Sequence, residues 1–146
     1  MESDEKIKTR TFLKLTQTHL QKLYLHGQQL QVVDLGYNKY FDDLLTDTEF
    51  KTVLLSISNK LSDRTLFWIV FDPTNESNTE PVCGDLVDDL GDICKDLKNA
   101  LLLFNKQQPE EIENAIWSFK SSFDIHWSDH CINAIYALHY FIQHAA

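Results

Sequence analysis

Apolar side chains recur every three or four residues along most of this chain, and this spacing places them on one face of an α-helix. The pattern predicts helices over residues 7–30, 38–45, 47–61, 85–104 and 109–145. Asn38 is suited to cap the second of these helices, and Pro109 suits the first turn of the last one. The helical phase continues through residues 124–129, so we expect either one long kinked helix or two helices that meet near Ser128.

Two segments are ambiguous. Residues 66–71 are six apolar residues in a row, and periodicity cannot separate a buried strand from a buried helix over such a run. We favour a short helix there, because the pattern shows no partner strand. Residues 28–37 fit either a last helical turn or a short extended piece, with Gly36 as a break.

Composition supports a helical fold. The chain has 146 residues with only four glycines and three prolines, whereas all-β folds need many turns. We therefore predict an all-α, bundle-like domain of five or six helices that covers residues 1–146 as one unit.

The net charge of −9 argues against two kinds of partner. Acidic surfaces repel nucleic-acid phosphates and anionic membranes, so we expect neither as a partner. The three cysteines, at positions 83, 94 and 131, do not form the pattern of a disulfide framework. The chain start lacks the features of a signal peptide, and no apolar run approaches the ~20 residues that cross a bilayer. We expect a cytoplasmic protein.

Polar residues form a stripe beside the apolar face of each of two helices. Each stripe spans about 60° of the helix circumference. The stripe on the helix over residues 85–104 consists of Asp85, Asp89, Asp92 and Asp96. The stripe on the last helix consists of His126, His130, Asn133, Ala137 and His144. If these helices pack antiparallel, the two stripes meet along one seam.

Such a seam has two interpretations. Histidines four residues apart present both rings to one side of a helix, as in zinc and di-metal helical sites. The first hypothesis is therefore a metal site for Zn, Mn or Fe, able to activate water for hydrolysis, built from Asp89, Asp92, Asp96, His126 and His130. The alternative is a structural polar seam, in which each histidine donates to an aspartate or a carbonyl without metal. We prefer this alternative, because no complete ligand motif such as H-E-x-x-H is present.

Aromatic residues suggest two further features. Tyr136, His139 and Tyr140 lie off the apolar face of the last helix and are candidates for an interaction patch. Trp68, Trp117 and Trp127 are core residues or, as a weaker alternative, the lining of a small-ligand pocket.

Three motifs resemble a known family. They are Phe67–Pro73 (F-W-I-V-F-D-P), Gly84–Lys98 (G-D-L-V-D-D-L-G-D-I-C-K-D-L-K) and His126–His130 (H-W-S-D-H), the last followed by Asn133-Ala134 and Ala137-Leu138-His139. In this order they are similar to the bacterial family catalogued as domain of unknown function 5063, over about residues 62–142. The resemblance implies an all-helical fold and no assigned activity. Gly91, Cys94 and Ser128 depart from the family pattern.

The function that we predict from the sequence is a protein-interaction module without catalysis, whose protein partner is unidentified. It needs no cofactor. The rival hypothesis is a metal-dependent, hydrolase-like enzyme that uses the Asp/His seam, so the sequence does not decide whether the chain is an enzyme. Its oligomeric state is equally open.

Overall fold

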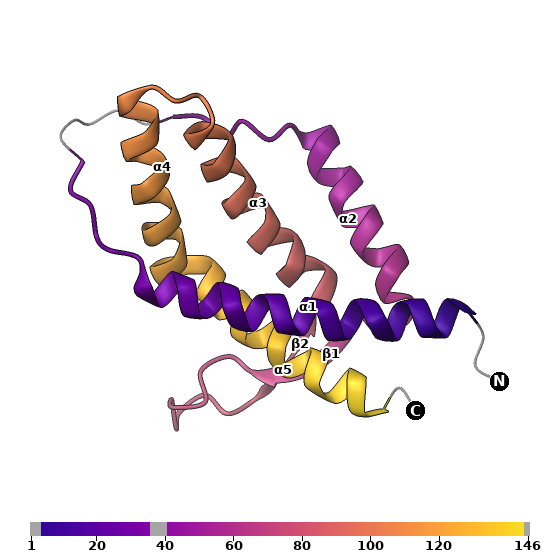
Figure 1. Ribbon diagram of the computed structural model, residues 1–146. Coiled ribbons are helices and arrows are strands. Elements are labelled where there is room, and N and C mark those ends of the chain that lie inside the picture. The colour runs from indigo at the N-terminus through magenta and orange to yellow at the C-terminus, as the bar shows by residue number, and fades with distance from the viewer. Residues whose placement is uncertain (1–3, 36–40, 145–146) are drawn as a thin grey trace.

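The computed structural model describes residues 4–35 and 41–144, and over these ranges the chain is mostly helical with one small hairpin. The elements in chain order are α1 (Asp4–Gln29), α2 (Asp47–Leu61), β1 (Leu66–Val70), β2 (Pro81–Asp85), α3 (Leu86–Phe104), α4 (Pro109–Ser122), the π-helical turn η1 (Phe123–Trp127) and α5 (Ser128–His144). Figure 1 shows α2, α3 and α4 side by side, with α1 crossing them and the hairpin lying near α5.

Side-chain caps fix where two of the helices begin. The Thr46 hydroxyl accepts a hydrogen bond from the Glu49 backbone N–H, and the Glu49 carboxylate accepts one from the Thr46 N–H. This reciprocal pair satisfies two backbone donors that a helix start leaves free. Asp85 caps α3 in the same sense, because its carboxylate accepts from the Val87 N–H. The predicted starts near residues 47 and 85 are therefore confirmed.

The last two helices form one continuous helix that bends where α4 meets α5 (Figure 1). The junction is η1, whose wider hydrogen-bond spacing inserts an extra residue into the turn. Of the two forms that we predicted near Ser128, the structure has the kinked continuous helix.

The core forms where α1, α3, η1 and α5 meet, and its largest fully buried side chains are Leu13, Leu61, Leu86, Trp127, Cys131 and Leu138. Phe123 and Trp127 pack edge to face with ring centroids 4.7 Å apart. A β-carbon at Gly27 would overlap both of these rings. Glycine at this position therefore lets α1 approach η1 closely, at some cost in helix propensity.

The predicted short helix over residues 66–71 is wrong. Leu66–Val70 is strand β1, paired antiparallel with β2 so that Leu66 lies opposite Asp85 and Val70 opposite Pro81. The residue pattern did not indicate the partner strand, because β2 contains proline and glycine, which are rare in strands and break the alternating pattern. Gly84 is needed there, since a β-carbon would overlap the ring of Phe67.

The segment before α2 also differs from the prediction. Residues 41–45 have no regular structure, so the helix predicted over residues 38–45 is wrong for that part, and Asn38 lies outside the described residues. The Asn99 side-chain oxygen accepts hydrogen bonds from the backbone N–H groups of Leu44 and Leu45, at 2.9 and 2.7 Å. Asn99, on α3, thus accepts the backbone hydrogen bonds that carbonyl groups of a local helix would have accepted.

The ambiguous segment over residues 28–37 divides at Gln29, where α1 ends. Residues 30–35 have no regular structure, and the rest of the segment lies outside the described residues. Among the helices of the described ranges, none is long and apolar enough to cross a membrane.

Candidate metal centre

Five polar side chains meet where α3 runs antiparallel to η1 and α5. Asp89, Asp92 and Asp96 come from α3, His126 comes from η1, and His130 comes from α5. The structure therefore brings together all five residues of the predicted Asp/His seam. Asp85 is separate from them, because its carboxylate caps α3.

Each histidine is held by one aspartate through its Nδ1 atom. The His126 Nδ1 lies 2.7 Å from the Asp96 Oδ2, and the His130 Nδ1 lies 2.7 Å from the Asp89 Oδ1. An ionised carboxylate only accepts hydrogen bonds, so each Nδ1 carries the proton and donates it. In a neutral imidazole the other nitrogen, Nε2, then presents a lone pair.

The two Nε2 atoms lie close to each other and to one carboxylate oxygen. They lie 3.2 Å apart, and the Asp92 Oδ2 lies 3.5 Å from the Nε2 of His130 and 4.0 Å from that of His126. The point equidistant from these three atoms, the centre of the circle through them, lies about 2.1 Å from each, and zinc bonds to histidine nitrogen and carboxylate oxygen are ~2.0–2.2 Å long. Asp92, His126 and His130 thus surround a position that lies at metal–ligand distance from one atom of each. These three residues form one potential metal-binding group.

Burial and charge both act on the pair formed by Asp89 and His130. Burial raises the pKa of Asp89, although the hydrogen bond from His130 opposes this shift. The hydrogen bond to Asp89 raises the pKa of His130 and outweighs the opposing effect of burial, with a further contribution from the negative charge of Asp92. The Asp89 shift reflects loss of solvent around its carboxylate, whereas the His130 shift reflects the attraction of Asp89 and Asp92 for positive charge.

The site is open to solvent on one side. The exposed fraction of the side chain is 44% for His126, 27% for Asp92 and 22% for His130. Structural zinc sites are closed by four protein ligands, whereas three ligands and access to solvent leave a position for water or a substrate. Asp89 and Asp96 do not complete the ligand set; they orient the histidine rings, as second carboxylates do in many zinc sites.

Sequence reasoning missed two things at this site. It did not separate Asp92, the one aspartate that faces both Nε2 atoms, from Asp89 and Asp96, which hold the rings. It also missed the π-helical turn that carries His126, for which the residue pattern offers no signal. Such turns occur frequently at functional sites.

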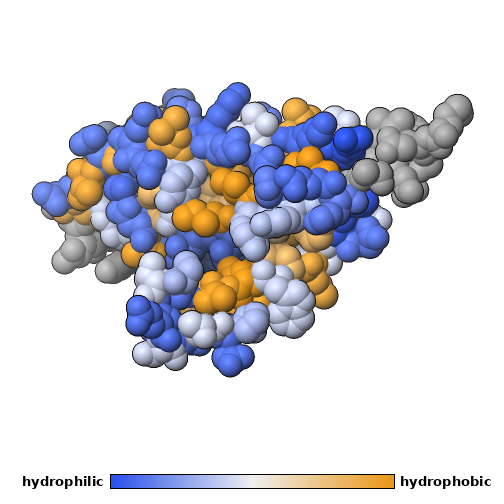
Figure 2. Space-filling view, turned by 90° about the horizontal axis from the view of Figure 1, so that it is seen from below, coloured by the Kyte–Doolittle hydropathy of each residue, from blue (hydrophilic) through white to orange (hydrophobic). Residues whose placement is uncertain are grey.

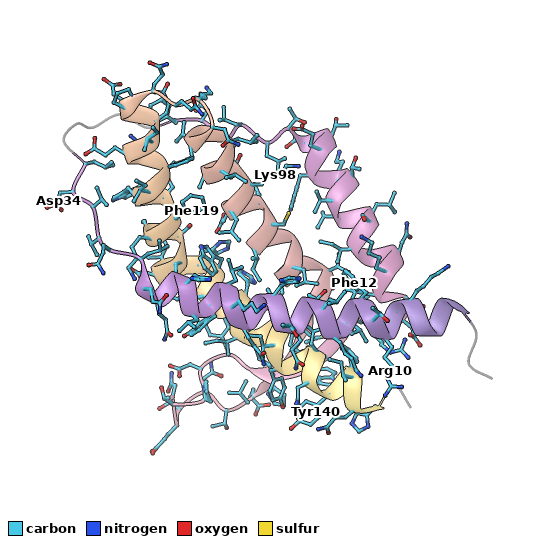
Figure 3. All side chains as sticks on the ribbon, in the orientation of Figure 1. Arg10, Phe12, Asp34, Lys98, Phe119 and Tyr140 are labelled. Carbon is cyan, nitrogen blue, oxygen red and sulfur yellow. The ribbon has the colours of Figure 1, made fainter. Side chains whose placement is uncertain are left out.

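The predicted interaction patch lies on another side of α5. Tyr136, His139 and Tyr140 are all exposed, and Tyr140 lies toward the C-terminal end of the helix (Figure 3). The Tyr140 ring packs edge to face against the other two rings, with centroids 5.1 Å away in both cases.

The three tryptophans do not share a pocket. Trp127 is buried in the core, Trp68 is 68% exposed on the hairpin, and Trp117 lines a cavity beside α3. The weaker alternative, a small-ligand pocket lined by all three, is therefore wrong, and the prediction of core residues is confirmed for Trp127 but wrong for Trp68.

Comparisons with known proteins identify a family and a fold. The family model described as "Domain of unknown function (DUF5063)" matches residues 1–144, which confirms the resemblance and extends it beyond residues 62–142. The crystal structure of protein BF1032 from Bacteroides fragilis is similar in fold, with a TM-score of 0.76 and 19% identity over 92% of this chain and 80% of that one. No curated protein matches the chain.

Proposed function

We propose that this chain, which belongs to the DUF5063 family, binds one divalent transition-metal ion between Asp92, His126 and His130. The observation that carries the proposal is the 3.2 Å distance between the Nε2 atoms of two imidazoles, each of which donates its Nδ1 proton to an aspartate. A purely structural seam gives each histidine a partner but does not require the two free nitrogens to face each other.

Two lone pairs at this distance repel unless a positive charge lies between them. Either one imidazole is protonated and donates to the other, or a metal ion accepts both lone pairs. A shared proton accounts for the two nitrogens, and the Asp92 charge favours it, but the Asp92 oxygen lies beyond the usual hydrogen-bond distance from both nitrogens. A metal ion also uses the Asp92 oxygen, whose 3.5 and 4.0 Å distances to the nitrogens complete the triangle. The metal therefore explains more of the geometry.

The donor set narrows the choice of metal. Two imidazoles and one carboxylate suit Zn²⁺, Mn²⁺ and Fe²⁺, whereas Mg²⁺ and Ca²⁺ prefer oxygen ligands. Asp89 and Asp96 accept the Nδ1 protons of the two imidazoles and so hold the rings with Nε2 available, which favours binding.

The open side of the site indicates what the metal would do. An ion held by three side chains keeps a position for water and lowers the pKa of that water, so that hydroxide forms near neutral pH. We therefore extend the proposal to metal-assisted hydrolysis as the class of reaction.

The test is the metal content of protein purified without an affinity tag. We expect close to one equivalent of Zn, Mn or Fe by mass spectrometry, or restoration of one equivalent by titration of the metal-free protein. A His126→Ala, His130→Ala double variant should lose it. The matched control is a His139→Ala, His144→Ala double variant, which removes two histidines from the same helix outside the seam.

Equal metal content in the two double variants would contradict the proposal, as would a wild-type protein that binds none of the three metals in calorimetry. Circular dichroism of each variant establishes that the fold is retained, so that loss of metal reports on ligands.

A further inference from the structure

A groove lies between the hairpin and α5, apart from the metal centre. It has a volume of about 460 Å³, within the range of ligand-binding pockets. Its lining consists of Ile69, Val70, Phe71, Pro73, Asp129, Ile132, Asn133 and Tyr136. Figure 2 shows hydrophobic side chains gathered on the face seen from below, the side on which the hairpin and α5 lie in Figure 1.

The groove borders the last two residues of β1, Ile69 and Val70. Successive side chains of a strand point to opposite faces of a sheet, so a groove lined by both Ile69 and Val70 lies beside the strand instead of on one face. The β2 residues opposite them are Val82 and Pro81, and neither lines the groove. The groove therefore follows the other edge of β1. Within the described residues β1 pairs only with β2, so that edge has no strand beside it.

Large apolar side chains are exposed around this edge. The exposed fractions are 82% for Phe71, 49% for Ile132 and 49% for Tyr136. A two-stranded hairpin with a free edge and exposed apolar residues is a template for another strand. The acidic Asp129 is exposed on the α5 wall of the groove, and the chain carries a net charge of −9, so positively charged side chains are favoured next to the apolar ones.

We propose that this groove binds an extended segment of another protein, which carries both apolar and basic residues on one face, as a third strand beside β1. Main-chain hydrogen bonds to β1 supply affinity, and the side chains that face α5 contact Ile132 and Tyr136 and, farther along the helix, Asp129, as in other cases of β-strand addition. A second copy of this chain is a poorer occupant, because its charge of −9 would repel the first.

The probe is a fluorescent seven-residue peptide in which lysine and valine alternate in pairs, so that each face of the extended peptide carries both. Its ends are blocked, and binding is measured by fluorescence anisotropy. We expect a dissociation constant below about 1 mM that weakens with added salt. The same peptide with methylated backbone nitrogens lacks the donors for strand pairing and should not bind. A peptide with glutamate in place of lysine tests the charge and should bind at least about 10-fold more weakly.

Variants locate the site. Ile132→Glu places a charge in the groove and should weaken binding at least about 10-fold, and Asp129→Asn should weaken it by a smaller factor and reduce the dependence on salt. Leu55→Glu is the matched control, because Leu55 is 63% exposed on α2 and is absent from the groove lining. Binding of the Leu55→Glu variant should equal that of the wild type.

Three results would overturn the proposal: no binding of the lysine–valine peptide, equal binding of its methylated form, or equal effects of Ile132→Glu and Leu55→Glu. A dimer detected by sedimentation that Ile132→Glu abolishes would overturn it in favour of a second copy of the chain. Metal content is measured on every groove variant and should equal that of the wild type, so the metal centre and the groove can fail separately.

Discussion

The two ends of the helix formed by η1 and α5 each carry a pair of histidines but differ in what faces them. Near the N-terminal end, His126 and His130 meet the aspartates of α3, which accept both Nδ1 protons. Toward the C-terminal end, the His144 ring stacks on the exposed Tyr140, with centroids 6.3 Å apart, and His139 contacts Gln143 on its own helix. Spacing along one helix therefore does not make a site; the residues on the facing helix decide which pair of histidines forms one.

The largest difference between the two ends of this helix should appear in the free energy of unfolding. Trp127 lies next to His126 and is 1% exposed, whereas Tyr140 is 46% exposed. Trp127→Ala should lower the free energy of unfolding by about 3–5 kcal/mol because it leaves a cavity in the core. Tyr140→Ala should change it by under ~0.5 kcal/mol. Urea unfolding followed by circular dichroism measures both, and similar losses would mean that η1 does not depend on the core for its position.

Metal affinity should depend on His130 but not on His139. His130→Ala removes one of the three ligands that we propose and should weaken metal binding more than about 100-fold, beyond the loss expected for an orienting residue. His139→Ala should leave the dissociation constant unchanged. Titration calorimetry with Zn²⁺ measures both variants, and an equal effect of the two would place the metal outside the seam.

The orienting aspartates should have an intermediate effect. Asp89→Asn and Asp96→Asn each remove a carboxylate that holds a histidine ring, and each should weaken metal binding by about 10–100-fold. The control is Asp88→Asn, because Asp88 is exposed on the same helix and makes no hydrogen bond to either histidine. If Asp88→Asn weakens binding as much as the other two, the aspartates act only through their total charge.

The smallest expected effects are stability changes of opposite sign in Asp92→Asn and Asp124→Asn. Asp92 lies near other carboxylates on α3, so Asp92→Asn should raise the stability of the metal-free protein by a few tenths of a kcal/mol, although it should weaken metal binding strongly. Asp124 pairs with Lys120 at 2.7 Å on the surface of the kinked helix, so Asp124→Asn should lower the stability by about 0.3–0.5 kcal/mol. Thermal unfolding in the presence of a chelator compares them. A loss of stability in Asp92→Asn would support a structural role for this residue.

Much of the helical framework could be predicted from the chain. The helices after residues 46 and 85 follow from capping residues and apolar periodicity, which act over a few neighbours. The hairpin could not be predicted in this way. Pairing of Leu66–Val70 with Pro81–Asp85 depends on contacts across the intervening loop, and Gly84 accommodates the ring of Phe67 only once the two strands are together.

The sequence by itself determined the family, through three short motifs. It also determined the mostly helical fold and the two polar stripes, because these depend on residues close together along one helix. Only the tertiary structure decided that α3 runs antiparallel to η1 and α5, that Asp92 faces both Nε2 atoms, and that Asp89 and Asp96 hold the rings. It also decided that β1 has a free edge beside α5. The reason is physical: distances between atoms on different elements depend on how the whole core packs, and helical periodicity carries no information about them.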